Sequence, residues 1–225
     1  MLLRDVGAVA LGYLLGSCPF AHWITRWRTG LRIRQVGDGN VGARNVFHIV
    51  GPTWGTLVGL LDGMKGLAAV LVARLLGGSL AAALLAGPAA VLGHWFPLFL
   101  RFQGGKGLAT ALGVMLAWSP WSTLVGVGML GVAQFFLRNF DRSVVFGAAT
   151  AIFLPPLFGR PWTLVLYNLV VFCALAVRKL IDLPHERRTW ARSGWRDAPY
   201  SDWYDAPAGG AESASRPAES GKKSG

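Results

Sequence analysis

The feature that most constrains this chain is the recurrence of apolar stretches about 20 residues long, the length that crosses a bilayer as a helix. Several of them are apolar on every side, whereas helices around a soluble core are amphipathic. The 225 residues are 53% hydrophobic and only 15% charged. The 30 glycines suit helices that pack closely in lipid. The sequence therefore predicts an all-α, polytopic membrane protein.

Apolar length and the positions of helix breakers predict seven transmembrane helices. They lie at about 5–25, 52–77, 79–100, 106–118, 120–137, 143–159 and 161–180. The fourth is short, so it is either a broken helix or one helix with its neighbour; Pro120 favours a turn there. "LGSC" at 15–18 is similar to a lipoprotein cleavage site, but Pro19 and further apolar residues follow it. We therefore expect an uncleaved first helix.

The distribution of Lys and Arg predicts the orientation of these helices. Nine lie in the connections 26–51, 101–106 and 138–142 and nine more from residue 178 on, which puts eighteen on one side. The other side holds three, namely Arg4, Arg74 and Arg160. Because cytoplasmic loops are rich in Lys and Arg, we expect a cytoplasmic (inner) membrane protein with its N-terminus outside and its C-terminus in the cytoplasm. The same rule accounts for the net charge of +11, so nucleic acid is not expected as a partner.

A change in composition divides the chain into three parts. Residues 1–182 form the predicted transmembrane domain, and 183–205 are basic and aromatic, which suits an anionic membrane surface. Residues 206–225 are low-complexity and predicted to be disordered. Cys18 and Cys173 lie inside apolar runs, so neither a disulfide nor a metal site made of paired cysteines is expected.

The polar segment "GDGNVGARN" at 37–45 combines three glycines with Asn40, Arg44 and Asn45. Glycines expose backbone N–H groups, which together with an arginine can bind an anion. An ordinary loop of turn residues is the alternative interpretation.

Two shorter polar signals lie inside predicted spans. Asp62 and Lys65 are three residues apart and share a helix face, where they either face a substrate or form an ion pair that joins helices. In "GSCP" at 16–19, Ser17 either donates to a substrate oxygen or bonds back to its own helix before Pro19, and the second interpretation is favoured on this stretch alone.

The segment "GHWFPLFLRFQGGKG" at 93–107 carries the strongest anion-binding pattern. Glycines at 104, 105 and 107 would let backbone N–H groups approach an anion, Lys106 would supply charge, and the next helix would add its dipole. A Walker A loop is excluded, because Leu100 and Gly107 stand where that motif requires a glycine and a Ser or Thr. His94 is a candidate general base or phosphate ligand, or a buried structural histidine. Together the segments predict a phosphate-bearing ligand at the cytoplasmic face, next to lipid.

In their order and spacing these segments resemble one known family, the bacterial membrane glycerol-3-phosphate acyltransferases that use acyl phosphate as donor (PlsY-like). The family pattern "GSxP", "GSGNxGATN", "DxxKG" and "GHxFPxFxxFKGGKG" reads here as "GSCP", "GDGNVGARN", "DGMKG" and "GHWFPLFLRFQGGKG". The match covers about residues 12–112. The seven-span, N-outside arrangement of that family agrees with the charge distribution.

The resemblance implies transfer of a fatty acyl group from acyl phosphate to the 1-hydroxyl of glycerol 3-phosphate, which gives lysophosphatidic acid and phosphate for phospholipid biosynthesis. It implies no cofactor, metal, coenzyme A or covalent acyl-enzyme. The acyl chain would lie between helices and in membrane lipid, and either His94 or the substrate's own phosphate would take the hydroxyl proton. The implied catalytic residues are Ser17, Asn40, Asn45 and His94. The implied phosphate- and substrate-binding residues are Arg44, Asp62, Lys65, Gly104, Gly105, Lys106 and Gly107.

Several positions depart from the family pattern and mark a divergent member. Asp38 replaces a serine, Arg44 a threonine, His48 an arginine and Gln103 a lysine. An arginine has thus moved by four residues, which is compatible with a rebuilt anion site. For a serine after the fifth span and for the C-terminal "HxxNxxR" element, the candidates are Ser143, His185 and Arg188.

Two other functions stay open at this stage. The same fold could acylate a different polyol phosphate or alcohol, as Asp38, Arg44 and His48 suggest. A non-enzymatic anion transporter or binding protein is the other, but the chain has no inverted repeat, and its polar groups gather at one face instead of at the midplane.

Overall fold

The computed structural model describes residues 1–193, and every regular element within that range is helical, as predicted. The α-helices are α1 Leu2–Ser17, α2 Phe20–Thr29, α3 Ala43–Ile49, α4 Pro52–Leu75, α5 Leu80–Trp95, α6 Leu108–Trp118, α7 Pro120–Leu137, α8 Phe140–Phe153 and α9 Thr163–Ser193. Three short 3₁₀ helices join them: η1 Ile33–Gln35, η2 Leu98–Leu100 and η3 Pro155–Phe158.

Within residues 1–193, five helical stretches are long and apolar enough to cross a membrane. They are Leu2–Thr29, Pro52–Leu75, Leu80–Leu100, Pro120–Leu137 and Thr163–Thr189. The predicted spans 106–118 and 143–159 correspond to α6 with 11 residues and α8 with 14. At 1.5 Å per residue these helices are roughly 16 and 21 Å long, shorter than a hydrocarbon core of about 30 Å. The multi-span membrane class is therefore supported, while the count of seven spans and their orientation stay predictions.

The predicted first helix, 5–25, is two helices. α1 ends at Ser17, and α2 begins at Phe20 after Pro19. Proline has no N–H to donate, and it disfavours helix at the residue before it, so a helix tends to end there. The Lys65 ammonium on α4 donates to the Cys18 carbonyl oxygen at 2.9 Å, which satisfies a backbone group at the break.

The last helix extends further than predicted. α9 runs from Thr163 to Ser193 with Pro184 inside it, so it crosses the domain boundary that the sequence suggested after residue 182. The membrane-surface segment predicted at 183–205 therefore begins as a continuation of this helix. The rest of that segment and the tail predicted at 206–225 lie outside the described residues.

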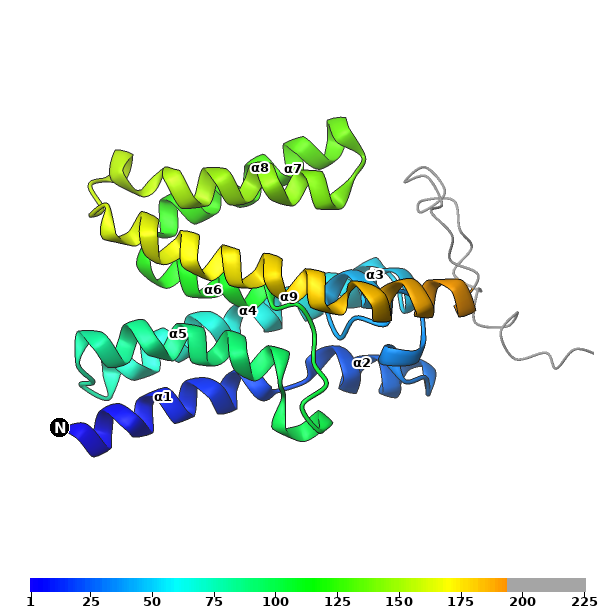
Figure 1. The fold of residues 1–225 in the computed structure, drawn as a ribbon, viewed down its shortest axis with the longest axis horizontal. Helices are drawn as coiled ribbons and strands as arrows, with labels where there is room; N and C mark the ends of the chain where they lie inside the picture. Colours follow the sequence, from blue (N-terminus) through cyan, green and yellow to red (C-terminus); the bar gives the residue numbers. More distant parts are fainter. Residues whose placement is uncertain (194–225) are drawn as a thin grey trace, which may run out of the picture.

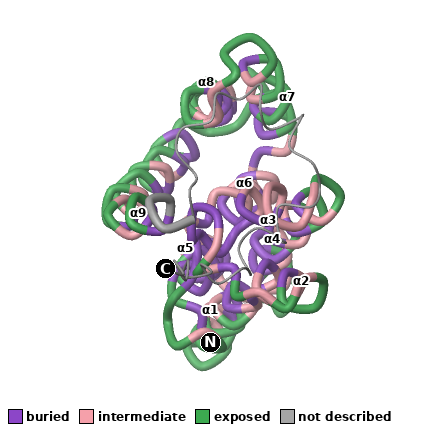
Figure 2. Tube along the Cα trace, turned by 90° about the vertical axis from the view of Figure 1, so that its right-hand side faces the viewer, coloured by how far each residue is buried: buried purple, intermediate pink, exposed green. Residues whose placement is uncertain are grey.

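The long helices lie side by side along the longest axis of the molecule, with the N-terminus at one end and α2, α3 and the end of α9 at the other (Figure 1). α1 packs on α5, α4 packs on α6, and α7 pairs with α8. Buried residues are concentrated in α4, α5 and α6, whereas the residues of α7 and α8 are more exposed (Figure 2). The polar segments 26–51 and 101–107 thus meet the last turns of α9 at one end of the helices.

Small residues set the closest helix contacts. A Cβ at Gly113 of α6 would overlap the Gly63 carbonyl oxygen of α4, and a Cβ at Gly66 would overlap the Thr110 carbonyl oxygen. Such backbone-to-backbone approach replaces the hydrophobic driving force that helices lack in lipid. It also holds Asp62 and Lys65 of α4 against the start of α6.

Gly113→Ala is therefore expected to destabilise the protein by about 1–3 kcal/mol, because the new methyl group has to push α4 and α6 apart. Gly131→Ala in α7 is the matched control, since nothing lies within 4 Å of its added Cβ. There, alanine should stabilise the helix by roughly 0.5–1 kcal/mol. Thermal unfolding of both variants in detergent measures the difference, and equal shifts would contradict the close approach.

Candidate active site

The buried ionisable residues of α4 and α5, Asp62, Lys65 and His94, form an inner cluster together with Thr110 of α6. The Lys65 ammonium lies 3.0 Å from the Asp62 carboxylate, which confirms the predicted shared helix face. The Nδ1 atom of His94 lies 3.8 Å from that carboxylate and 3.3 Å from the Thr110 hydroxyl. All four side chains are buried. Thr110 was not predicted, because a threonine in an apolar helix carries no pattern of its own.

The inner cluster borders a very small pocket. The pocket has a volume of about 10 Å³, scarcely enough for one water molecule. Its lining includes the break between α1 and α2, Val41 of the 37–45 loop, and the side chains Asp62, Lys65 and His94. Because Lys65 already contacts both Asp62 and the Cys18 carbonyl, the structure favours its role in joining helices.

Ser17 has the structural role that its own stretch of sequence favoured. Its hydroxyl donates to the Tyr13 carbonyl oxygen at 2.9 Å, one helical turn back, and the residue is completely buried. The α5 backbone at Gly93 lies directly against it. The structure thus gives Ser17 a hydrogen bond within its own helix, and the catalytic role implied for it stays a prediction.

Asn45 holds the 33–40 segment together. Its amide nitrogen lies 3.0–3.1 Å from the carbonyl oxygens of Ile33, Val36 and Asn40, and its amide oxygen accepts from the Asp38 N–H at 3.3 Å. Both ends of the amide thus bind the 33–40 segment to the start of α3, and the catalytic role that the resemblance implies for Asn45 stays a prediction. Asn40 differs, because its buried amide oxygen has no hydrogen-bond partner among the described residues.

Two backbone N–H groups of the predicted 104–107 cradle already have hydrogen-bond partners within the chain. The N–H groups of Gly104 and Gly105 donate to the carbonyl oxygens of Trp95 and His94, at 3.0 and 3.1 Å. These two amides therefore fix the segment to the end of α5 and do not point at an anion. A Cβ at Gly105 would overlap both the Val41 carbonyl oxygen and the His94 ring, so glycine is required here for close packing.

Gly107 is the residue just before α6, and its left-handed backbone, φ +83°, favours glycine. The first N–H groups of that helix have no intrahelical acceptor, and with the helix dipole they remain a possible anion contact. The Trp95 indole N–H donates to the Lys106 carbonyl oxygen at 2.7 Å and holds the start of the helix in place. The helix dipole and the Gly107 backbone therefore offer the more direct anion contact, and the roles implied for Gly104 and Gly105 stay predictions.

Lys106 belongs to an outer cluster with Asp38 and Glu186. Its ammonium lies 2.6 Å from the Glu186 carboxylate of α9, and both side chains are largely buried. Asp38 is buried as well, at 3% exposure, and accepts from the Asn40 N–H at 2.9 Å. Glu186 was missed from the sequence. The available signal was the neighbouring His185, whose ring lies against Gly39 in the same loop.

Burial shifts the protonation of two groups at this end of the molecule towards their neutral forms. Burial raises the pKa of Asp38, and Lys106 only partly opposes that change. Burial also lowers the pKa of His48 to about 4, with Arg44 acting in the same direction. His48 is therefore neutral at pH 7, and it does not supply the charge of the arginine that the family pattern has there.

The remaining predicted residues lie at other places. Arg44 pairs with Asp141 of α8 at 3.7 Å and lies over the Phe140 ring. The Ser143 hydroxyl donates to the Asn139 carbonyl oxygen, and Arg188 is exposed on α9. Within residues 1–193, no three side chains of His, Cys, Asp or Glu are grouped so that they could hold a metal ion.

A membrane-type helical fold with ionisable groups gathered at one end is consistent with an enzyme that acts at the membrane surface. The family described as glycerol-3-phosphate acyltransferase matches residues 6–186, which is most of the chain. The chain therefore belongs to that family.

Curated relatives carry the same description. A glycerol-3-phosphate acyltransferase of Anaeromyxobacter sp. (strain Fw109-5) is 41% identical over 181 residues, 79% of this chain and 87% of the relative. Glycerol-3-phosphate acyltransferase 2 of Moorella thermoacetica is 37% identical and covers 82% of this chain and 93% of the relative.

Solved structures of PlsY, described as an integral membrane glycerol 3-phosphate acyltransferase, share the fold. Its glycerol 3-phosphate form superposes with a TM-score of 0.72 at 31% identity, covering 85% of this chain and 94% of PlsY. Its lysophosphatidic acid form has a TM-score of 0.68, also at 31% identity.

Asn45→Ala should destabilise the protein strongly, because it leaves buried backbone groups of the 33–40 segment unpaired at about 1–3 kcal/mol each. Asn40→Ala is the matched comparison, since the Asn40 amide oxygen has no described partner. Its melting temperature should fall much less. Thermal unfolding in detergent measures both, and an Asn45→Ala protein with unchanged melting temperature and raised acceptor KM would restore the substrate role.

The raised pKa of Asp38 predicts how its effect on stability depends on pH. The folded protein keeps the Asp38 proton at pH values where the unfolded chain, with a pKa near 3.8, has lost it. The stability of the wild type relative to Asp38→Asn should therefore fall as pH rises from about 4 through the folded pKa, and then stay constant. Denaturant unfolding of both proteins from pH 4 to pH 8 tests this, and a difference that moves in the opposite direction would show that Asp38 is ionised favourably.

Proposed function

We propose that this protein is an acyltransferase that moves a fatty acyl group from an acyl phosphate to the 1-hydroxyl of glycerol 3-phosphate. The hydroxyl oxygen forms a bond to the acyl carbonyl carbon, the bond from that carbon to the phosphate oxygen breaks, and lysophosphatidic acid and inorganic phosphate are released. The observation that carries this proposal is the match to PlsY in its glycerol 3-phosphate form, at TM-score 0.72 over 94% of that chain.

The site itself supports an activity of this kind. Acyl phosphate is already activated, so the protein has mainly to position two anions and stabilise the departing phosphate. Lys106 and the first turn of α6 are a cation and a helix N-terminus beside each other, and both favour phosphate. His94 lies against the backbone of Gly105, one residue before Lys106. His94 and the substrate's phosphate remain the two candidate acceptors for the hydroxyl proton.

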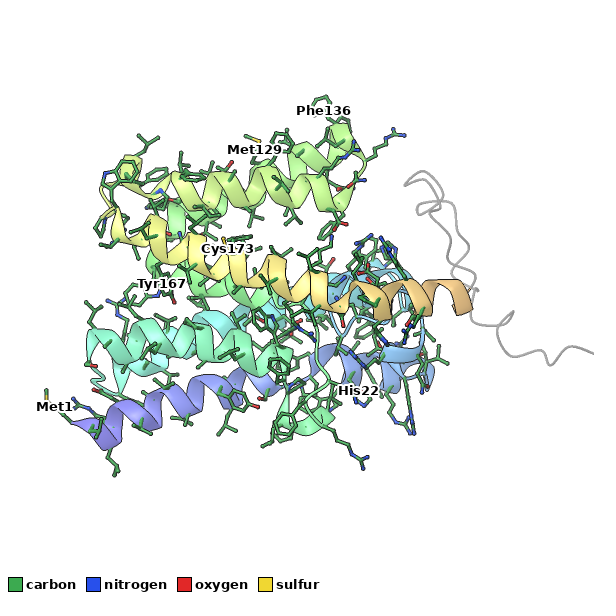
Figure 3. All side chains as sticks on the ribbon, in the orientation of Figure 1. Met1, His22, Met129, Phe136, Tyr167 and Cys173 are labelled. Atoms are coloured by element: carbon green, nitrogen blue, oxygen red, sulfur yellow. The ribbon has the colours of Figure 1, made fainter. Side chains whose placement is uncertain are left out.

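We also propose that the reaction takes place at the cytoplasmic face of the inner membrane. The excess of Lys and Arg in the connections around residues 26–51 and 101–106 supports that side. Many nitrogen-bearing side chains gather where α2, α3 and the end of α9 lie, at the opposite end from Met1 (Figure 3). The apolar outer faces of the helices would leave the acyl chain in contact with lipid throughout.

The test is release of inorganic phosphate from palmitoyl phosphate by the purified protein in detergent, with and without glycerol 3-phosphate. Wild type should show acceptor-dependent release together with lysophosphatidic acid. Lys106→Ala should lose about 10²-fold or more in kcat/KM, because it removes a charge aimed at a phosphate. Arg101→Ala is the matched control, an exposed cation five residues away whose loss should leave the rates unchanged.

A different acceptor is the second candidate, and two observations favour it. Asp38 places a buried carboxyl where the family pattern has a serine, and His48 is neutral where the pattern has an arginine. In the same assay, a panel of polyol phosphates and alcohols at equal concentration separates the two candidates. Faster transfer to another acceptor would replace glycerol 3-phosphate, while absence of acyl transfer to every acceptor would overturn both.

A further inference from the structure

The cytoplasmic end of α9 presents one polar face to the two loops of the site. Asp182, Glu186 and Thr189 are each less than 9% exposed and lie four and three residues apart, so they share that face. His185 and Thr189 lie against Gly39 of the 37–45 loop, and Glu186 reaches Lys106. Helix α9 therefore closes the candidate site from the side that the sequence motifs do not describe.

The contact with Lys106 places an anion where the proposed function requires one. A carboxylate oxygen of Glu186 lies 2.6 Å from the Lys106 ammonium, the separation of a strong charge-assisted hydrogen bond. Glu186 is 3% exposed, so its charge has little access to water. The Asp38 carboxyl lies close enough to this pair for the charges of both Lys106 and Glu186 to affect its pKa. The one lysine between the site's glycines is thus already neutralised by the chain itself.

From this geometry we infer that Glu186 determines acceptor affinity by acting as an internal anion that the acceptor's phosphate must displace from Lys106. The inference deepens the proposed function and rests on it only for the identity of the phosphate. A phosphate dianion carries more charge than a carboxylate and has more acceptor oxygens, so it can replace the Glu186 carboxylate at the Lys106 ammonium. A neutral polyol offers nothing to replace the carboxylate, because separating a buried ion pair leaves an uncompensated charge.

A purely structural ion pair is the competing explanation, and it predicts a different outcome. If the pair only ties α9 to the 104–107 segment, removing the charge of Glu186 lowers the melting temperature and leaves phosphate affinity unchanged or weaker. If Glu186 competes with phosphate, removing its charge strengthens phosphate binding, and the gain depends on Lys106.

Binding of inorganic phosphate to the full-length protein in detergent, measured by calorimetry, tests the inference without acyl transfer. Glu186→Gln should bind phosphate roughly 5-fold or more tightly than wild type, the lower end of usual coupling between sites. Glu186→Asp, whose carboxylate is one methylene further back, should lie between them. Asp5→Asn removes the same charge from the first turn of α1, at the opposite end of the molecule, where an amide oxygen can still accept from the Ser79 N–H, and it should bind as wild type does.

The double variant decides whether the gain acts through Lys106. In a Lys106→Ala background, Glu186→Gln should give no further gain in phosphate affinity. A gain that persists there, or is equally large in Asp5→Asn, would mean a general effect of charge and would overturn the inference. Unchanged or weaker phosphate binding by both Glu186→Gln and Glu186→Asp would also overturn it.

Kinetics separate this inference from the proposed function. With palmitoyl phosphate as donor, Glu186→Gln should lower the KM for glycerol 3-phosphate by a similar factor and leave kcat undiminished. Active wild type with an unchanged or raised KM in Glu186→Gln would keep the proposed function and reject the role of Glu186. If the wild type is inactive but Glu186→Gln binds phosphate more tightly in a way that depends on Lys106, the role of Glu186 stands and the proposed function is rejected.

Discussion

The candidate site depends on one close approach, the backbone of residues 104–107 against the end of α5. Gly104 and Gly105 donate to the carbonyl oxygens of Trp95 and His94, and the Trp95 indole donates back to Lys106. A side chain at Gly105 would also displace the 37–45 loop at Val41. These contacts fix where α6 begins and where Lys106 projects. The glycines thus serve packing first, and charge for an anion has to come from side chains and from the helix N-terminus.

This arrangement explains how much the sequence could predict. Apolar length predicted the helical membrane class, because bilayer thickness dictates it. Helical periodicity predicted that Asp62 and Lys65 share a face, which their 3.0 Å ion pair confirms. The use of the backbone amides was not predictable. It depends on which carbonyl oxygen each N–H meets, and Gly104 meets one that lies nine residues away across a turn.

The same limit explains the residues whose roles changed. The resemblance implied a catalytic role for Asn45, but its amide is already hydrogen-bonded to carbonyl oxygens of residues 33–40. Glu186 was missed because its partner is 80 positions away in sequence, and only the docking of α9 brings them together. The break after Ser17 was underestimated because lipid-spanning helices tolerate proline when another side chain, here Lys65, satisfies a freed carbonyl.

The ion pairs of this end of the molecule have a common consequence for any anionic substrate. Lys65 is paired with Asp62, Arg44 with Asp141 and Lys106 with Glu186, so each cation expected to bind phosphate already has a carboxylate. In the two buried pairs, Lys65 with Asp62 and Lys106 with Glu186, a single charge would be costly to maintain, and pairing keeps these cations charged without a ligand. Substrate binding at such a site is therefore an exchange of anions and not an addition. The affinity for the acceptor then depends on how much more strongly the ammonium binds phosphate than it binds the carboxylate. Changing the carboxylate is therefore a more direct way to change acceptor affinity than changing the lysine.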